Sequence, residues 1–500
     1  MDFLQHAIYG FSIALQPINL LFCFVGVFVG TLIGVLPGIG AAATVSLLLP
    51  ATLGMAPAAS IIMLSGIYYG AMYGGSTTSI LVNIPGEAAS AVTCLDGYQM
   101  ARQGRAGPAL GMAAFGSFIA GTLSILFLTF LSPVLADVAM KFGPPEYVSL
   151  MFLGLTILAY LAHGSMIKAL SMAVVGLLIG TVGVDLISGI PRFTFGLEEF
   201  YDGIDIVSVM MGLFGISEVL INIEEGVERD IYETKVKGLF PTLRDWKDSI
   251  MPIGRGTILG FLLGILPGGG AVISSFVSYA VEKRLSKHPE KFGKGAIEGV
   301  AGPESANNAA SGGAFVPLLT LGIPSNVVMA LLLGALVIHG VKPGPLLIQE
   351  APDVFWGTIY SMYVGNVMLL VLNLPLIGMW VKVLKVPYLL LFPLILIFCV
   401  IGSYGAANKL MDVNVMIFFG LIGYLMKKTE YEAAPLVLAV ILGPIFEKSI
   451  RQSLMVSSGS FATFFTRPIS CALLVVAFLL LITATVPRKL FLNKLPADDV

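Results

Sequence analysis

Charged residues are scarce in this sequence. Asp, Glu, Lys and Arg make up 12% of the 500 residues and hydrophobic residues make up 57%, whereas a soluble domain carries about 25% charged residues. Many windows of ~20 residues are nearly free of charge, and a helix of that length crosses a bilayer. The composition therefore excludes a soluble globule. It predicts an all-α polytopic membrane protein with about 10–12 transmembrane helices in contact with membrane lipid.

The motifs of hydrolases, metalloenzymes and ATP-driven pumps are absent. The four cysteines and four histidines are scattered without CxxC or HExxH spacing, and neither GxSxG nor GxxxxGK[ST] occurs. A disulfide framework, a zinc site, a serine nucleophile and a phosphate-binding loop therefore lack their minimum chemistry. The net charge of −2 and the short, separate basic clusters argue against a nucleic-acid partner. We expect no enzyme, no catalytic residue and no bound metal.

One stretch of the sequence is present twice. Gly30-Thr-Leu-Ile-Gly-Val-Leu-Pro-Gly-Ile-Gly-Ala41 is identical at eight of twelve positions to Gly260-Phe-Leu-Leu-Gly-Ile-Leu-Pro-Gly-Gly-Gly-Ala271, 230 residues later. In the first copy, an apolar run breaks at Leu-Pro-Gly and resumes as a segment too short to cross a bilayer comfortably. This pattern is typical of a re-entrant hairpin, which is tolerated only where protein or a water-filled cavity satisfies its backbone.

The repeat divides the chain into three parts. We expect a first transmembrane repeat over residues 1–223, a charged cytoplasmic linker over residues 224–250 and a second transmembrane repeat over residues 251–500. After the hairpins, which include residues 18–53 and 253–280, the expected spans are 58–84, 108–135, 147–161, 166–184, 206–223, 314–338, 354–381, 388–404, 413–426, 433–446 and 468–486. The segment 433–446 is short, and we expect it to be interfacial or re-entrant.

Each half also contains a second predicted break. Gly74, Gly75 and Pro85 mark it in the first half, and Gly322-Ile-Pro-Ser325 marks it in the second. Basic clusters at 229–247 and 283–294 place both ends of the second hairpin in the cytoplasm. Five crossings between the two hairpins put the first hairpin on the opposite face. The sequence thus predicts an inverted repeat with broken helices, and one miscounted span would make the repeat parallel.

Broken helices near the midplane mark the substrate site of many secondary transporters. A half-helix N-terminus carries about half a positive charge and can hold a carboxylate, while hydroxyl, carbonyl and carboxamide oxygens suit a hard cation. The candidate substrate-binding residues are Gly38, Gly40, Ser76, Thr77, Thr78, Gly268, Gly269, Gly270, Asn307, Asn308, Ser325 and Asn326. The candidate coupling-cation residues are Asn83, Glu304, Ser305 and Ser311.

Helix packing is the alternative for these small polar residues, because Gly, Ser and Thr are enriched where membrane helices touch. Packing is favoured for any single Ser or Thr, whereas the adjacent carboxamides Asn307 and Asn308 favour a functional role. Three roles stay open for Glu304: it is a cation ligand or proton carrier, a helix cap, or a residue that faces the cytoplasm. The other acids in or near the breaks are expected to be loop residues: Glu87, Asp96 and Asp185.

Three motifs together resemble a known family. The paired Leu-Pro-Gly-x-Gly motifs, the segment Gly302-Pro-Glu-Ser-Ala-Asn-Asn-Ala-Ala-Ser-Gly-Gly-Ala-Phe-Val-Pro317 and Leu321-Gly-Ile-Pro-Ser325 resemble the large membrane subunit of the tripartite tricarboxylate transporters, the TctA family. The resemblance covers nearly the full length. It implies a bacterial inner-membrane permease that works with a small four-helix membrane subunit and a periplasmic solute-binding protein. It also implies an ion gradient as the driving force and carboxylates such as citrate as substrates.

The predicted function is cation-coupled uptake of a di- or tricarboxylate, with Na⁺ or H⁺ as the coupling ion and no other cofactor. A passive anion channel is one alternative, because the same polar breaks serve a channel. A membrane-embedded enzyme is the other, although Glu304 is its only weak candidate for acid–base chemistry at midplane depth. The sequence does not identify the carboxylate or the coupling ion.

Overall fold

The computed structural model describes residues 3–36, 40–161, 165–185, 188–225, 238–266, 270–383, 391–407 and 409–485. This part of the chain is almost entirely helical, and its single sheet pairs β1 (Gly183–Val184) with β2 (Pro191–Arg192). Six of the described helices are long and apolar enough to cross a membrane, and four shorter apolar helices accompany them. The prediction of an all-α polytopic membrane protein is therefore confirmed.

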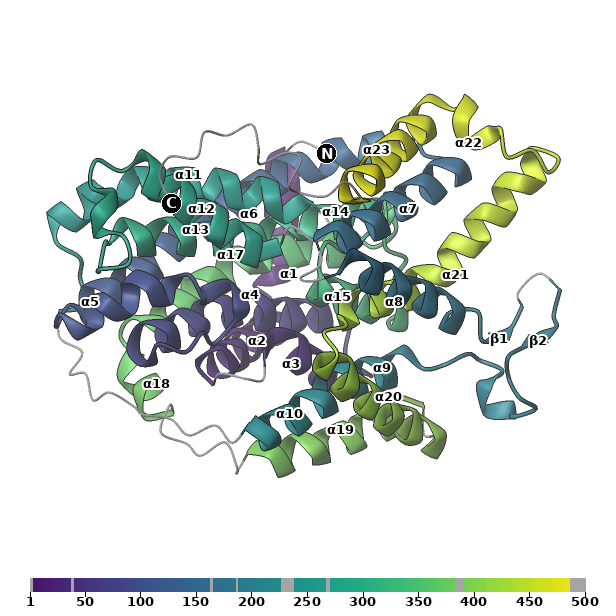
Figure 1. The fold of residues 1–500 in the computed structure, drawn as a ribbon, viewed down its shortest axis with the longest axis horizontal. Helices are drawn as coiled ribbons and strands as arrows, with labels where there is room; N and C mark the ends of the chain where they lie inside the picture. The colour runs from purple at the N-terminus through teal and green to yellow at the C-terminus, as the bar shows by residue number, and fades with distance from the viewer. Residues whose placement is uncertain are drawn as a thin grey trace.

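The elements of the first half are shown in purple to blue and those of the second half in teal to yellow (Figure 1). The first half contains α1 (Phe3–Ala14), α2 (Pro17–Val35), α3 (Gly40–Leu48), η1 (Pro50–Thr52), α4 (Pro57–Val82), η2 (Ala88–Ser90), the π-helix η3 (Cys94–Tyr98), α5 (Gln99–Arg102), α6 (Ala106–Ala139), α7 (Pro144–Leu161), α8 (Met166–Ile179), β1, β2, η4 (Glu198–Phe200), α9 (Ile206–Met210), the π-helix η5 (Met211–Ile216) and α10 (Ser217–Glu225). The second half contains α11 (Leu243–Ile265), α12 (Gly270–Leu285), η6 (Pro289–Lys291), α13 (Glu298–Gly313), α14 (Phe315–Leu321), α15 (Val327–Ile338), α16 (Leu347–Glu350), α17 (Pro352–Asn373), α18 (Ile377–Val383), α19 (Leu391–Ala407), α20 (Leu410–Lys428), α21 (Ala433–Val456), α22 (Thr463–Thr466) and α23 (Pro468–Thr485).

The first helix of each hairpin packs on the helix that follows the hairpin through three glycines spaced four residues apart. On α2 these are Gly26, Gly30 and Gly34, where a Cβ atom would overlap backbone carbonyl oxygens of α4. On α11 they are Gly256, Gly260 and Gly264, where a Cβ atom would overlap backbone carbonyl oxygens of α13. The three positions in one half are offset by 230 residues from those in the other, which is the offset of the duplicated motif. Small residues allow such backbone contact between membrane helices.

The order of these contacts fixes the direction of the helices. Both pairs run parallel, because the contacts advance together along the two helices, so the chain turns back between them through α3 or α12. In contrast, α4 runs antiparallel to α13 and α14: its Ser76 contacts Glu304, and its earlier Tyr68 contacts the later Phe315. An inverted repeat requires this antiparallel relation. The repeat boundaries and the re-entrance of the hairpins in a bilayer stay predictions.

The break predicted in the first half is wrong at the two glycines, Gly74 and Gly75, and is confirmed near Pro85, which lies in the non-helical stretch after α4. The helix α4 continues through both residues to Val82 and ends at Asn83, which has a left-handed φ of 59°. Neither glycine breaks the helix, because both serve close packing: a Cβ atom on Gly74 would overlap the carbonyl oxygen of Thr31, and one on Gly75 would lie 3.1 Å from the backbone nitrogen of Glu87. The break predicted in the second half is present, because α14 ends at Leu321 and α15 begins at Val327.

Other boundaries also differ from the sequence prediction. The expected span 354–381 is divided into α17 and α18, and α21 extends to Val456 rather than ending at residue 446. The second half of α21 was missed because it carries charges, of which Glu447 and Arg451 form an ion pair at 2.6 Å one turn apart. A helix of 24 residues is long enough to span, so the expectation of a short segment is wrong.

The helix α11 begins at Leu243, inside the stretch expected to be linker. Thr242 accepts a hydrogen bond from the backbone nitrogen of Asp245 at 3.2 Å, and the Asp245 carboxylate accepts one from the backbone nitrogen of Thr242 at 2.9 Å. This reciprocal capping box satisfies two backbone donors at the start of the helix. Charged residues in the first two turns hid this start from a reading based on hydrophobicity.

Replacing Thr242 with alanine should therefore destabilise the folded chain. We expect a loss of about 1 kcal/mol, the typical contribution of an N-terminal cap, measured by chemical denaturation of the full chain in detergent. Arg244→Ala is the control, because Arg244 lies in the same helical turn with an 85% exposed side chain. An equal loss in both variants would contradict the capping role.

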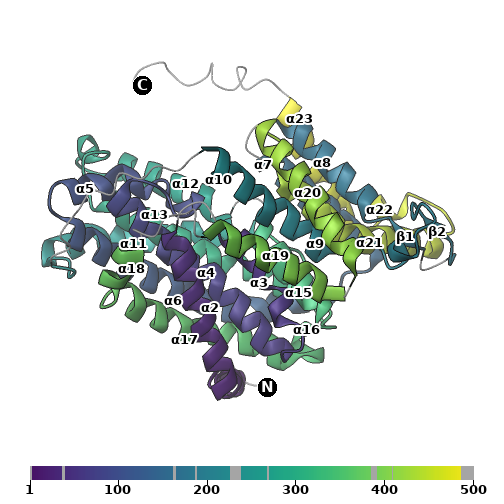
Figure 2. The ribbon, with the colours of Figure 1, turned by 90° about the horizontal axis from the view of Figure 1, so that it is seen from below.

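The helices form two layers that each contain elements from both halves. The inner layer consists of α1–α6 and α11–α17, and the flanking layer consists of α7–α10 and α19–α23 (Figure 2). Within the flanking layer, α7 meets α23 at a hydrogen bond of 2.7 Å between Ser149 and Ser470, and Gly176 of α8 packs on the backbone of Leu436 of α21. The two hairpins, the break after α4 and the break between α14 and α15 all belong to the inner layer.

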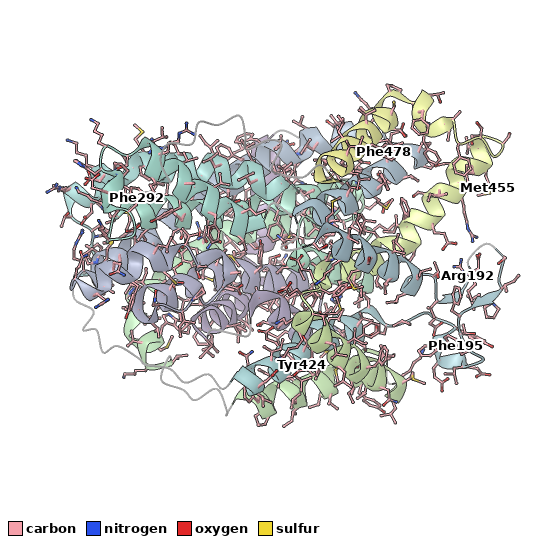
Figure 3. The ribbon with its side chains drawn as sticks, viewed as in Figure 1. Arg192, Phe195, Phe292, Tyr424, Met455 and Phe478 are labelled. Atoms are coloured by element: carbon pink, nitrogen blue, oxygen red, sulfur yellow. The ribbon has the colours of Figure 1, made fainter. Side chains whose placement is uncertain are left out.

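Basic loops of the two halves meet at one end of the molecule. The side chain of Gln103 donates a hydrogen bond of 2.7 Å to the carbonyl oxygen of Lys294, which joins the loop after α5 to the loop before α13. Phe292, in the second of these loops, lies at the left end of the molecule, whereas Arg192 and Phe195 lie at the right end (Figure 3). Because basic loops favour the cytoplasm, we expect the left end to face the cytoplasm.

Candidate functional site

Glu304 lies at the interface between α4 and α13 and is 0% exposed. Ser76 of α4 donates a hydrogen bond of 2.5 Å to its Oε2, and Thr93, which precedes η3, donates one to its Oε1. The helix α13 begins six residues earlier at Glu298. Glu304 is therefore neither a helix cap nor exposed to the cytoplasm. It links two segments of the first half that lie on either side of the break after α4.

The two adjacent asparagines have different environments. The Nδ2 of Asn308 donates hydrogen bonds to Ser117 Oγ at 2.7 Å and to the carbonyl oxygen of Glu304 at 3.1 Å. Asn307 is 0% exposed, and neither its Nδ2 nor its Oδ1 has a hydrogen-bond partner in the described part of the chain. A buried carboxamide without a partner is costly. Asn308 therefore has a structural role, and Asn307 is free to bind a ligand.

The cavities at the interface between α4 and α13 and next to it are small. One of about 20 Å³ is lined by Asn308 and Ser311 together with Tyr73 of α4. Another of about 10 Å³ is lined by Ser76, Thr77 and Tyr73, among others. Such volumes accommodate about one water molecule. In the described part of the chain, the interface is thus closed to a carboxylate of the size of citrate.

The break between α14 and α15 lies next to α4. The side chain of Asn326 caps α15 by accepting a hydrogen bond from the backbone nitrogen of Met329 at 3.0 Å, and it donates one of 3.1 Å to the hydroxyl of Tyr68. Ser325 is buried and donates to the carbonyl oxygen of Ala314 at 3.5 Å. Asn326 is therefore at the interface between the halves, on the α4 side, whereas this contact of Ser325 lies within the second half.

The hairpin tips are described only in part. Gly40 and Gly270 begin α3 and α12 with left-handed φ values of 71° and 41°, whereas Gly38, Gly268 and Gly269 lie outside the described residues. The backbone nitrogen of Ala41 donates a hydrogen bond of 2.5 Å to the carboxylate of Glu87. Glu87 lies in the loop after α4, as expected, and its carboxylate also occupies the N-terminal end of α3.

The remaining candidates are dispersed. Thr78 donates a hydrogen bond of 2.8 Å to the carbonyl oxygen of Val35, which is a packing contact between α4 and α2. Ser305 is buried with an unpartnered hydroxyl, and a Cβ atom on Gly116 of α6 would lie 3.1 Å from it. Asn83 is exposed at the end of α4, and no contact of the described residues joins it to Glu304.

The sequence reasoning missed the contacts of two residues, Thr93 and Asp96, that join the first half to the second. The sequence around Thr93 does not indicate its role, because a single threonine after a break is common. Asp96 was expected in a loop but lies in η3, is 0% exposed and accepts hydrogen bonds from the backbone nitrogens of Gly295 and Ala296 at 2.7 and 2.8 Å and from the Tyr279 hydroxyl at 2.9 Å. A lone acid between apolar segments was the signal for Asp96.

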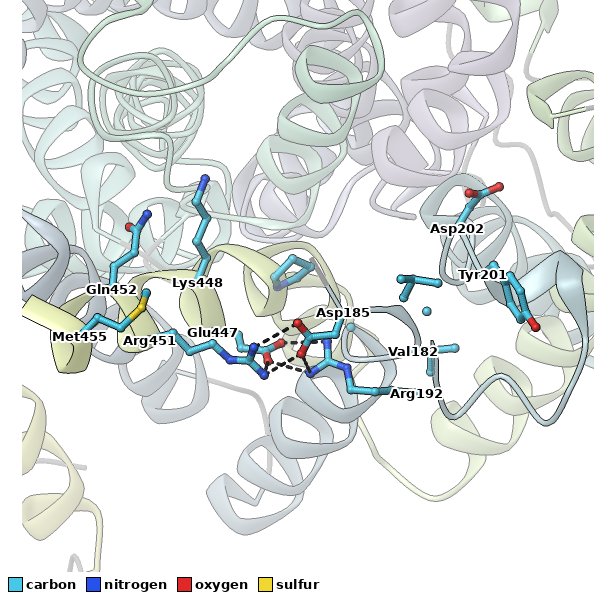
Figure 4. Close-up of a pocket in the computed structure, with 14 residues that line it drawn as sticks. Val182, Asp185, Arg192, Tyr201, Asp202, Glu447, Lys448, Arg451, Gln452 and Met455 are labelled. Carbon is cyan, nitrogen blue, oxygen red and sulfur yellow. Dashed lines mark hydrogen bonds and ion pairs between the residues drawn. The ribbon is translucent and has the colours of Figure 1, made fainter. Parts of the chain in front are cut away.

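A larger cavity lies elsewhere, in the flanking layer. Its volume is about 520 Å³, and its wall carries the paired side chains of Asp185, Arg192, Glu447 and Arg451 (Figure 4). Asp185 is a loop residue, as expected. These four charges neutralise one another at the end of the molecule opposite the basic loops, so this cavity is distinct from the interface between the broken helices.

The comparisons with known proteins agree with this architecture. The model of the "Tripartite tricarboxylate transporter TctA family" matches residues 20–438. The chain is 53% identical over 487 residues, 97% of each chain, to a protein from Agrobacterium vitis described as "Uncharacterized 52.8 kDa protein in TAR-I ttuC' 3'region".

A second protein from Agrobacterium vitis, "Uncharacterized protein in TAR-II ttuC' 3'region", is 52% identical over 228 residues, which are 46% of this chain and 94% of that protein. No solved structure matches the chain. Because the family model covers most of the sequence and the 53% identity extends over its full length, the chain belongs to the tripartite tricarboxylate transporter TctA family of membrane transport proteins.

Proposed function

We propose that this chain is the large permease subunit of a tripartite transporter that takes up a di- or tricarboxylate with one or more cations across the bacterial inner membrane. The observation that carries the proposal is Asn307, a fully buried carboxamide without a partner, beside Glu304 at the interface between α4 and α13. A polar group in such a place favours a ligand that satisfies it during the transport cycle.

The small cavities support transport by alternating exposure rather than through a permanent pore. The cavities at this interface and next to it have volumes of about 20 and 10 Å³, so a carboxylate enters only when α4 and α13 or their neighbouring hairpins move. Cations that accompany the anion reduce its charge. With ~100 mV across the membrane, each net positive charge moving inward contributes about 2.3 kcal/mol.

Membership in the family supports two partners. We propose a small four-helix membrane subunit, which would cover part of the apolar surface, and a periplasmic solute-binding protein, which would deliver the carboxylate to the end opposite the basic loops. The positive charge of the loops at 283–294 supports the assignment of that end to the cytoplasm.

Uptake by proteoliposomes tests the function. The full chain, co-purified with its partner subunits and supplied with binding protein, should accumulate radiolabelled citrate or succinate saturably and only under an inward Na⁺ or H⁺ gradient. Linear, gradient-independent flux would indicate a channel instead. Chemical conversion of the label, followed by chromatography of the vesicle contents, would indicate an enzyme.

A further inference from the structure

Three acidic side chains lie around the break after α4. They are Glu87 in the break, Asp96 in η3 and Glu304 in α13. None of them forms an ion pair with a basic side chain in the described part of the chain; their hydrogen-bond donors are backbone nitrogens and hydroxyl groups. A carboxylate held in a membrane protein interior without a positive partner is costly. At least one of these groups therefore needs positive charge from outside the chain.

The donors distinguish the three acids. Asp96 accepts two backbone N–H groups and a tyrosine hydroxyl, and Glu87 accepts the backbone N–H of Ala41 at the start of α3. These N–H groups lie at or near helix N-termini, where partial positive charge stabilises an anion. Glu304 accepts only the hydroxyl groups of Ser76 and Thr93. The negative charge of Glu304 is therefore the least stabilised of the three by groups of the chain itself.

Hydroxyl groups also allow Glu304 to change partners. A serine or threonine hydroxyl rotates freely and carries two acceptor lone pairs, so it can donate to a carboxylate in one state and bind a cation through its oxygen in another. Asn307 lies three residues after Glu304 and therefore on the same face of α13, and its Oδ1 has no partner. Carboxylate, hydroxyl and carboxamide oxygens together are suitable ligands for a hard monovalent cation.

We propose that Glu304, with Ser76 and Thr93, takes up the single positive charge of the coupling cation, and that this step precedes binding of the carboxylate substrate. The inference rests on the proposed function. An anion that approaches Asn307 meets the negative charge of Glu304 on the same helix face, and like charges repel strongly where water is excluded. A proton or a sodium ion on Glu304 removes this repulsion, so substrate affinity depends on prior cation binding.

Other titratable groups face this site from every neighbouring element, and their charges are accounted for. On α4 and η3 they are Tyr73, Cys94 and Asp96, of which Asp96 is held by its three donors. On α11 and α12, Arg255 is paired with Glu282, and Tyr279 donates to Asp96. The face of α6 toward α13 contributes Gly116 and Ser117, which carry no charge.

Thermal unfolding of the full chain tests cation binding without substrate. NaCl in place of choline chloride, or a change from pH 8 to pH 6, should raise the Tm of the wild-type chain by about 2–5 °C, and Glu304→Gln should abolish the shift. Asp96→Asn is the control and should keep it. A wild-type chain whose Tm responds to neither ion, or a Glu304→Gln chain that responds normally, overturns the proposal. The ion that shifts the wild-type chain identifies the coupling cation.

Transport measurements test the order of binding. Glutamine keeps the shape of Glu304 without its charge, so Glu304→Gln should still exchange internal for external citrate or succinate but should no longer accumulate either along a cation gradient. Should this variant not fold, Thr93→Val should raise the cation concentration for half-maximal uptake about tenfold. Accumulation by Glu304→Gln with normal cation dependence overturns the inference alone, whereas a wild-type chain that transports no carboxylate contradicts the proposed function.

Discussion

Replacing Asn307 with leucine is expected to lower carboxylate uptake by about 10- to 150-fold and, at the same time, to stabilise the folded chain. The first effect follows from the loss of a hydrogen bond to a charged ligand, which contributes about 1.5–3 kcal/mol. The second follows because the native carboxamide is buried without a partner, and replacing such a group with an apolar one of similar size removes a cost of about 1–3 kcal/mol. Initial uptake rates and Tm values of the same preparation measure both effects.

Asn308→Leu is the matched control. Asn308 differs from its neighbour in that it donates to Ser117 and to the backbone of Glu304, so its replacement leaves the Ser117 hydroxyl without this partner. We expect this variant to lower the free energy of unfolding by about 1–3 kcal/mol, which a lower Tm would report. If Asn307→Leu instead destabilised the chain as much as Asn308→Leu while transport continued, the assignment of Asn307 to the substrate site would be wrong.

Replacing Gly260 with alanine is expected to have the largest effect on folding. A Cβ atom there would overlap the backbone of Ala306, and backbone cannot move aside as a flexible side chain can. Overpacking typically costs about 1–3 kcal/mol and more where backbone must shift. Because α11 and α13 meet along three such glycines, we expect a loss of about 3 kcal/mol or more and a low yield of folded protein, measured by size-exclusion chromatography and Tm.

Gly254 provides a control on the same helix. A Cβ atom on Gly254 would meet nothing within 4 Å among the described residues. Gly254→Ala should therefore be neutral or should stabilise the chain by up to about 1 kcal/mol, since alanine favours a helix more than glycine does. Equal behaviour of the two variants would contradict the role of Gly260 in helix packing.

The parts of the fold that hydrophobicity controls could be predicted from the sequence. The starts of α2, α4 and α23 agree with the expected spans to within one residue, because long apolar runs have few alternatives in a membrane. The predicted boundaries were wrong where charged residues lie within a helix or where glycines serve helix packing. Charged turns concealed the start of α11 and the end of α21, and Gly74 and Gly75 mark close packing rather than a break.

The site could be predicted only as a region. Adjacent carboxamides in an apolar context pointed to Asn307 and Asn308, but the difference between them depends on Ser117, which is 191 residues away along the chain. The same holds for Glu304, whose partners Ser76 and Thr93 come from the other half. Contacts of this kind arise from the packing of α4 and α6 against α13, which no single stretch of sequence encodes.

The glycine contacts also decide where the inner layer can open. At the three glycines of each pair, backbone is pressed against backbone between α2 and α4, and likewise between α11 and α13, so we expect each pair to move as one body. The interface of α4 with α13 and α14 is different, because a hydroxyl group and a carboxyl group join α4 to α13, and two aromatic rings join α4 to α14. Of the surfaces within these four helices, we therefore expect the one that holds Glu304 to separate during a transport cycle.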